Sequence, residues 1–211
     1  TRSTQVLRDV LGAAFGGVIS CDYYSAYLCF MKESSAVMQF CLAHLIRDVK
    51  FLADSGDKVT RNWAEKVLNL FRKLFSLIHR KDELTEAHFQ RTLIKLRDQL
   101  IKKFRAAPPR QGPQNLRERF KLNPKKFFTF ITTPGVQPTN NFTEQAIRYL
   151  IIDRRITQGT RSPKGRKWCE RIWTTISTCE AQGHSTFQFL CDAVTAHFNG
   201  LAPPSLVPAG P

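Results

Sequence analysis

The chain has 211 residues, of which 42% are hydrophobic, so it holds enough apolar material to bury a core and is not expected to be disordered. Lys and Arg number 32 against 17 Asp and Glu, and the formal net charge of +15 predicts a polyanionic partner, with nucleic acid the first candidate. The sequence has no run of about 18 apolar residues and no signal-peptide pattern, so we expect a soluble, intracellular protein that does not span a membrane. The six cysteines form no CxxC pair, and we expect them to be reduced and packed as small apolar side chains.

Helices and strands alternate in residues 1–56. In chain order we expect a helix over 6–14, a strand over 17–21 that ends on Asp22, a helix over 26–31, a strand over 36–41 and a helix over 43–53. This alternation predicts a helix-rich α/β architecture, and residues 1–56 would form the first part of its core.

Residues 57–115 carry no strand signal and are predicted to form an all-helical insertion. Apolar residues repeat at helical spacing over 63–77 and again over 89–104, which predicts a helical hairpin with Trp63 in its core. The segment 106–115 contains three prolines and one glycine, and we expect it to close the insertion as a linker.

Residues 116–200 are predicted to form the second part of the core. After an aromatic-rich segment at 127–131 we expect a helix from Asn140 and Asn141 through Leu150, followed by an extended segment over 151–156. A basic loop over 158–167 should then lead to two helices, over 168–182 and 185–198. Trp168 and Trp173 lie at helical spacing and are expected to be core anchors. Residues 201–211 are rich in proline and are expected to be a flexible tail.

Asp22 is the first candidate for chemistry, because it follows a buried strand. In open α/β sheets, ligand and metal sites form at the carboxyl ends of strands. The structural alternative is that Asp22 caps the helix that follows it.

Glu144 is the second candidate, and its structural alternatives are also plausible. The spacing from Asn141 to Glu144 is that of a capping box, and Glu144 and Arg148 are spaced as an i,i+4 ion pair. Spacing alone does not decide between these roles and a catalytic one.

Three blocks of sequence, in this order, resemble the insertion-sequence family sixty-six transposases. The first runs from Val18 through Asp22 to Tyr27, the second from Cys41 through His44 to Asp48, and the third from Pro138 through Asn140, Asn141 and Glu144 to Arg148. The similarity continues over residues 154–165 and 203–208, so it covers nearly the whole chain. Two departures are Gln145, where the family usually has Arg, and Arg47-Asp48, where a pair of basic residues is common.

This resemblance implies a DDE transposase with an RNase H-like core, here an incomplete one that carries the helical insertion. In that family an Asp, a second Asp and a Glu hold two divalent metal ions, Mg²⁺ or Mn²⁺; Asp22 matches the second acid and Glu144 the third. Carboxylates are needed because hard cations activate the nucleophile of phosphodiester cleavage and neutralise the leaving oxyanion. Asp9, the only earlier acid, lies in a helical pattern and does not match the first acid, so we expect the chain to begin inside the catalytic domain.

The resemblance also implies the partners and the setting. We expect the protein to act on transposon ends and target DNA, as a homo-oligomer, in the bacterial cytoplasm at the nucleoid. Basic residues cluster around Glu144 and the loop after it, where a DNA backbone would pass. They are Arg148, Arg154, Arg155, Arg161, Lys164, Arg166 and Lys167. The structural alternative is an ordinary solvated surface.

Cys41 and His44 have the spacing of half a zinc site, but no second pair follows at metal-ligand spacing. We expect His44, Asn140 and Asn141 to lie beside the acids instead. The alternative to an enzyme is a non-catalytic DNA-binding remnant of a truncated transposase, and the helical hairpin could also serve as an interaction module.

Overall fold

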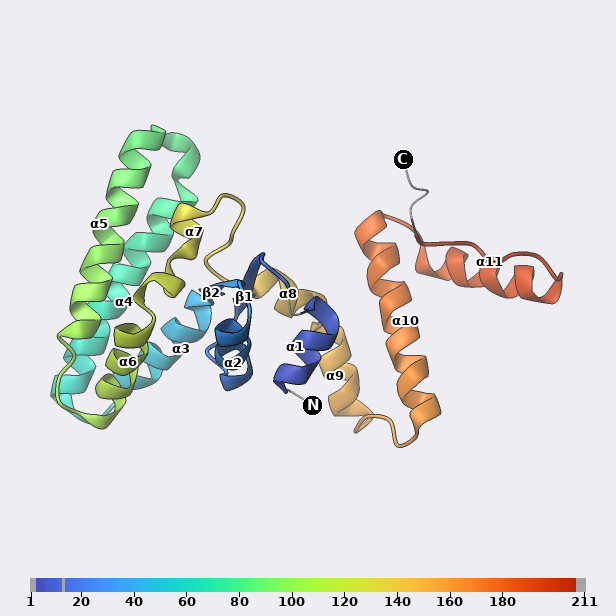
Figure 1. Cartoon of the computed structure of the whole chain (residues 1–211), viewed down its shortest axis with the longest axis horizontal. Coiled ribbons are helices and arrows are strands. Elements are labelled where there is room, and N and C mark those ends of the chain that lie inside the picture. The colour runs from blue at the N-terminus through green and yellow to red at the C-terminus, as the bar shows by residue number, and fades with distance from the viewer. Residues whose placement is uncertain (1–2, 13, 208–211) are drawn as a thin grey trace. The chain divides into compact units, whose positions relative to one another are not determined.

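The computed structural model describes residues 3–12 and 14–207. The chain divides into two compact units, residues 1–141 and residues 142–211, and helices make up most of both (Figure 1). The segments 1–56, 57–115 and 116–200 remain predictions about chain organisation, and the apolar core of the first unit draws residues from all three.

A two-stranded parallel sheet lies in the first unit. Strand β1 (Val18–Cys21) pairs with β2 (Val37–Phe40) in a register that runs from Val18 opposite Val37 to Cys21 opposite Phe40. Helix α2 (Ser25–Glu33) connects the two strands, as parallel pairing requires. Both strands lie where the sequence predicts them.

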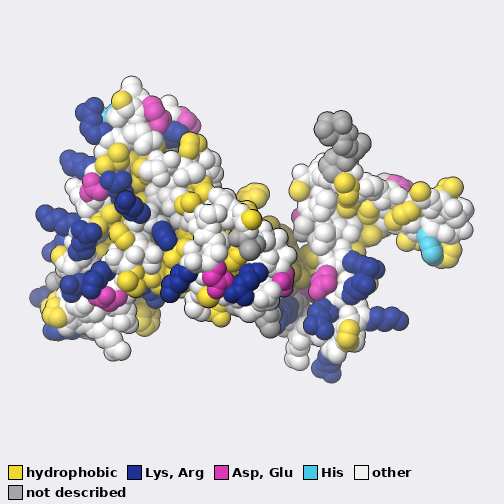
Figure 2. All heavy atoms as spheres, in the orientation of Figure 1, with side chains coloured by type: hydrophobic (Ala, Val, Ile, Leu, Met, Phe, Trp, Pro, Cys, Tyr) yellow, Lys and Arg dark blue, Asp and Glu magenta, His cyan; other side chains and the backbone are white. Residues whose placement is uncertain are grey.

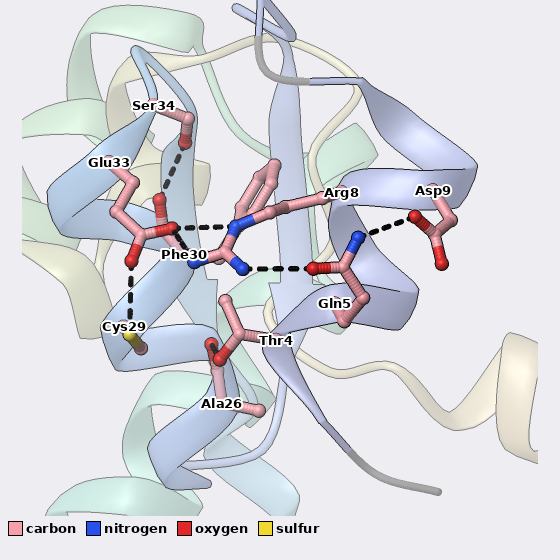
Figure 3. A network of polar contacts seen from close by, with 9 residues as sticks. All are labelled: Thr4, Gln5, Arg8, Asp9, Ala26, Cys29, Phe30, Glu33 and Ser34. Carbon is pink, nitrogen blue, oxygen red and sulfur yellow. Dashed lines mark hydrogen bonds and ion pairs between the residues drawn. The ribbon is translucent and has the colours of Figure 1, made fainter.

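Helix α1 (Thr4–Leu11) packs on α2 and is joined to it by polar contacts (Figure 3). The Arg8 guanidinium donates from Nε and Nη2 to Glu33 Oε2, at 3.0 and 2.6 Å, and Cys29 Sγ lies 3.3 Å from Glu33 Oε1. These bonds hold the pKa of the Glu33 carboxyl below its ordinary value.

The predicted helical hairpin is confirmed. Helix α3 (Leu42–Ala53) leads to α4 (Lys58–His79), which a short 3₁₀ turn, η1 (Lys81–Glu83), joins to α5 (Glu86–Arg105). The apolar stripe of each helix is buried, and Trp63 is 6% exposed with its Nε1 donating to the Lys103 carbonyl at 3.1 Å. Side chains cap both long helices: Asp57 accepts from the Thr60 amide at 3.0 Å, and Thr85 accepts from the His88 amide at 3.4 Å.

The linker prediction over 106–115 is wrong in its second half. Helix α6 (Gln111–Leu122) begins inside that segment, with Pro113 buried in its first turn. A proline is tolerated there because the first amides of a helix have no acceptor within the helix. A Cβ at Gly112 would lie 2.5 Å from the end of the Leu52 side chain, so glycine allows α6 to approach α3 closely.

The aromatic segment at 127–131 forms two short helical turns beside β2. These are η2 (Pro124–Phe127) and α7 (Thr129–Thr132). The fully buried Gln39 side chain donates to the Phe127 carbonyl at 3.1 Å and accepts from the Phe130 amide at 2.9 Å, while Thr129 Oγ1 donates to the Met38 carbonyl at 2.6 Å. Side-chain hydrogen bonds thus fasten this segment to β2.

Stacked aromatic rings connect the hairpin to the sheet. The Phe120 ring lies 3.9 Å from Phe104 and 4.5 Å from Phe127, centroid to centroid, and is nearly parallel to both. Phe127 in turn lies 5.2 Å from Phe40 on β2, whose ring is 4.9 Å from Tyr23. The core is therefore continuous from α5 through α6 to the end of the sheet.

All regular secondary structure among the described residues of the second unit is helical. Its helices are α8 (Asn141–Ala146), α9 (Arg148–Ile156), α10 (Pro163–Gln182) and α11 (Thr186–Phe198). The first residue of α8, Asn141, is the last residue of the first unit. The prediction of an extended segment at 151–156 is wrong, since those residues form the end of α9. The β-branched isoleucines favour a strand, but the described part of this unit offers no other strand to pair with, and helical bonds such as Thr157 N to the Asp153 carbonyl (2.8 Å) satisfy the backbone instead.

Burial is sparse in the second unit. Among its described residues only Cys179 and Ala196 are buried, whereas Trp168 is 63% and Phe187 77% exposed. Trp168 is therefore not a core anchor within this unit, and Figure 2 shows hydrophobic side chains on the surface of α11.

Leu201 to Val207 have no regular secondary structure, and residues 208–211 of the predicted tail lie outside the described residues. No helix in the described part of the chain is both long and apolar enough to cross a bilayer.

Candidate active site

Asp22 stands at the carboxyl end of β1, as the sequence predicts. Because β1 and β2 are parallel, both strands end at the same edge of the sheet, and the Cys41 amide extends the ladder by donating to the Cys21 carbonyl at 2.8 Å. Asp22 and Cys41 therefore leave the sheet side by side. The capping alternative for Asp22 is wrong, because the residue at the N-cap of α2 is Tyr24, whose side chain makes no capping hydrogen bond.

The first two motif blocks and the start of the third meet at this edge. The Leu42 amide donates to the Pro138 carbonyl at 2.9 Å, and the Asn140 amide donates to Cys41 Sγ at 3.4 Å. The chain thus brings Asn140 beside the start of α3, although about 100 residues separate it from Cys41. The whole arrangement lies within the first unit.

An open pocket of about 190 Å³ lies at these strand ends. Its polar lining includes Asp22, Tyr23, His44, Arg47, Asp48 and Arg119, and Phe40 and Phe127 contribute to its apolar wall. The expected position of His44 beside Asp22 is consistent with this lining.

Two oxygen atoms in this region are buried but receive no hydrogen bond from the described residues. They are Oδ1 of Asp22 and Oδ1 of Asn140. A buried acceptor without a donor costs free energy, so each of these atoms can accept a further hydrogen bond or ligate a cation. Carboxylate and amide oxygens are ligands that Mg²⁺ and Mn²⁺ prefer, so the chemistry of each atom fits such an ion.

Thiolate chemistry is not favoured here. Burial, followed by the neighbouring Asp22 charge and then Cys41, raises the pKa of the Cys21 thiol to about 12, so that it stays protonated near neutral pH. In the part of the chain that the structure describes, no three His, Cys, Asp or Glu side chains gather closely enough to form a metal centre by themselves. All six cysteines are unpaired by disulfides; Cys21, Cys41 and Cys179 are buried, while Cys29 and Cys191 are exposed.

Sequence reasoning missed Arg119 and its partner Asp48 as residues of this pocket. Arg119 lies on α6, and its Nη1 donates to Asp48 Oδ2 on α3 at 2.6 Å. The guanidinium also lies 5.3 Å from the centre of the Tyr23 ring. No motif marks Arg119, because its position depends on the packing of α6 against α3.

The other predicted site residues lie on the surface of the chain. Asn141 and Glu144 are exposed on α8, the latter in the second unit. The seven predicted phosphate contacts are all exposed, on α9, the loop after it and α10: Arg148, Arg154, Arg155, Arg161, Lys164, Arg166 and Lys167. Figure 2 shows Lys and Arg side chains gathered around the start of α10.

The basic chain, with an acid at the end of a parallel strand, has the features of a protein that acts on nucleic acid. A comparison with known protein families matches the family described as Transposase IS66 family over residues 1–167. This match covers both strands, the pocket, the helical hairpin and Glu144, so the chain belongs to the IS66 family of DDE-type transposases. No curated protein and no solved structure gives a significant match.

Membership of this family implies DNA binding and a reaction that generally uses divalent metal. The resemblance inferred from the three sequence blocks is thereby confirmed. The described fold is a mostly helical one with a small parallel sheet.

Proposed function

We propose that the chain contributes to cleavage and strand transfer of insertion-sequence ends, with Asp22 as a ligand of the catalytic metal ion. The observation that carries this proposal is the buried Oδ1 of Asp22, which receives no hydrogen bond from the described residues and stands at the edge of the sheet where the motif blocks meet. In this proposal β1 and β2 belong to an RNase H-like core.

Asp22 and the amide oxygen of Asn140 are the groups of the first unit that would hold Mg²⁺ or Mn²⁺. The bound ion supplies an activated water or 3′-hydroxyl nucleophile and neutralises the leaving oxyanion. His44 lines the same pocket, from which it can orient water or a phosphate oxygen by hydrogen bonding.

Glu144 enters the proposal through the family motif, as the third acid. The motif also includes an acid earlier than Asp22. Asp9 is not assigned to that role, because it lies exposed on α1 and accepts a hydrogen bond from Gln5 Nε2 at 2.7 Å.

The basic residues of α9, the following loop and α10 are proposed to hold DNA phosphates. Their exposure leaves their charges available to the polyanion, and the formal net charge of +15 supports binding that is strongly salt-dependent. We propose that the protein works as a homo-oligomer on transposon and target DNA in the bacterial nucleoid.

The Asp22→Asn variant tests the metal assignment with two measurements. This substitution keeps the size of the side chain and removes its charge, so we expect calorimetric titration with Mg²⁺ or Mn²⁺ to show at least about tenfold weaker binding. We expect cleavage of transposon-end DNA to fall by two orders of magnitude or more, on the order of the loss of a major charge-stabilising group. Binding of the same DNA is expected to persist.

Asp9→Asn is the matched control, since it removes one carboxylate from an exposed helix and changes the net charge equally. It should alter neither metal binding nor cleavage. Wild-type metal affinity and cleavage in Asp22→Asn would remove the assignment. DNA binding without metal binding in the wild type would favour a non-catalytic DNA-binding remnant.

A further inference from the structure

The ion pair between Arg119 and Asp48 differs from the other inter-helical pairs by its position. It joins α6 to α3 in the lining of the pocket to which Asp22 also contributes, and the two side chains are 34% and 38% exposed. An ion pair that is this accessible contributes little to stability, so stabilisation alone is a weak reason for it.

The geometry of the guanidinium leaves part of it available. Only Nη1 donates to Asp48, whereas Arg8 uses both Nε and Nη2 on Glu33 (Figure 3). Among the described residues, no hydrogen bond from Nε or Nη2 of Arg119 to another group is found. An arginine carries five N–H donors in a planar fork, so one edge can hold a carboxylate while another takes a phosphate oxygen.

The guanidinium is also held in place. Its central carbon lies 5.3 Å from the Tyr23 ring centre, within the range of a cation–π contact, and the Tyr23 hydroxyl accepts from Asn123 Nδ2 at 3.3 Å. The contacts with Asp48 and Tyr23 together restrict the rotamers of a long side chain. Binding then costs less conformational entropy than it would for a free surface arginine.

We propose that Arg119 is a phosphate-binding residue of the Asp22 pocket, which takes a phosphodiester of DNA while Asp48 and Tyr23 hold its guanidinium. The inference rests on the proposed function, because it gives that site a contact for the DNA backbone. Arg47 lines the same pocket and adds a second positive charge there.

The test uses the paired variant Arg119→Gln/Asp48→Asn, because it removes one charge of each sign and keeps the net charge of the chain. The matched control is Arg8→Gln/Glu33→Gln, which removes a half-exposed ion pair of similar exposure, 42% and 40%, between α1 and α2. Fluorescence anisotropy measures binding of a short labelled DNA duplex over a series of NaCl concentrations. Thermal unfolding followed by circular dichroism checks that each variant is folded.

For the Arg119 pair variant we expect about three- to tenfold weaker DNA binding, and a slope of log K against log salt that is shallower by about 0.9, the value for one phosphate contact. The control pair should match the wild type in both. If the Arg119 pair variant does not fold, Arg119→Lys supplies the answer. A lysine keeps the positive charge, so the salt slope should stay that of the wild type. It lacks the planar guanidinium that can donate to Asp48 and to a phosphate at the same time, so the affinity for DNA should still fall.

Wild-type affinity and salt slope in the folded pair variant would overturn the inference, as would an equal loss in the control pair. Wild-type affinity in Arg119→Lys would also overturn it. These outcomes are separate from failure of the metal assignment: an Asp22→Asn protein that cleaves normally would remove the proposed function, whereas a reduced slope in the Arg119 pair variant would still support phosphate binding.

Discussion

The stack of aromatic rings through Phe120 makes a quantitative prediction about stability. Phe120 is 1% exposed, and its ring lies against Phe104 of α5 on one face and Phe127 of η2 on the other, at 3.9 and 4.5 Å. Phe120→Ala removes both ring contacts and leaves a cavity between the hairpin and the sheet. Truncation of a buried Phe costs about 3–5 kcal/mol, and the loss of two stacked contacts places this residue toward the upper end of that range.

Urea denaturation followed by circular dichroism measures this loss. Phe120→Leu keeps an apolar side chain at the site and should cost less than Phe120→Ala, because less volume is lost. Phe51→Ala is the control in the same unit: Phe51 is 79% exposed on α3, so its truncation should change the free energy of unfolding by less than about 0.5 kcal/mol. If Phe120→Ala lost less than about 1 kcal/mol, the idea of a continuous core from the hairpin to the sheet would be wrong.

Two further predictions concern polar groups of the first unit. Gln39→Leu should lower the free energy of unfolding by about 1–3 kcal/mol in the same urea assay, because it leaves the partly buried Phe130 amide and the buried Phe127 carbonyl without their side-chain partner. An unchanged urea midpoint would contradict this prediction. The Thr60 side chain and, to a smaller extent, the Thr60 amide donate hydrogen bonds to Asp57 and hold the pKa of its carboxyl below the ordinary value of 3.8. The stability that this cap contributes is therefore present above pH 3.8 and is lost as the pH falls through the lowered pKa. Asp57→Ala should therefore be less stable than the wild type at neutral pH and converge with it in strong acid, and a difference that persisted at the lowest pH would contradict the assignment.

Sequence patterns predicted the strands and the hairpin helices of the first unit well. The two strands are short apolar runs bounded by turns, and the hairpin helices carry regular apolar stripes, so these two patterns located all four elements. Helix α6 was missed because Pro113 and Gly112 indicate a linker. The decisive facts were tertiary ones, the burial of Pro113 in the first turn and the close approach of Gly112 to Leu52.

The candidate site was predictable only in part, for a similar reason. Asp22 could be located because it ends an apolar strand, and the motif blocks led to Asn140. Arg119 could not be located, since it reaches the pocket only through the packing of α6 on its neighbours. A residue whose role depends on the placement of its helix leaves no signal in its own sequence neighbourhood.

The helices of the second unit show how far an apolar pattern can be interpreted. The prediction for 151–156 used the β-branched character of its isoleucines, but strand propensity needs a partner strand before it lowers the free energy of a segment. In α9 to α11 the apolar side chains lie on amphipathic helices, and the unit itself buries only Cys179 and Ala196 among its described residues. Helical periodicity reports that one face of a helix is apolar; it does not report what covers that face. Trp168 shows the consequence, because its spacing is that of a core residue while 63% of its surface is exposed within the described chain.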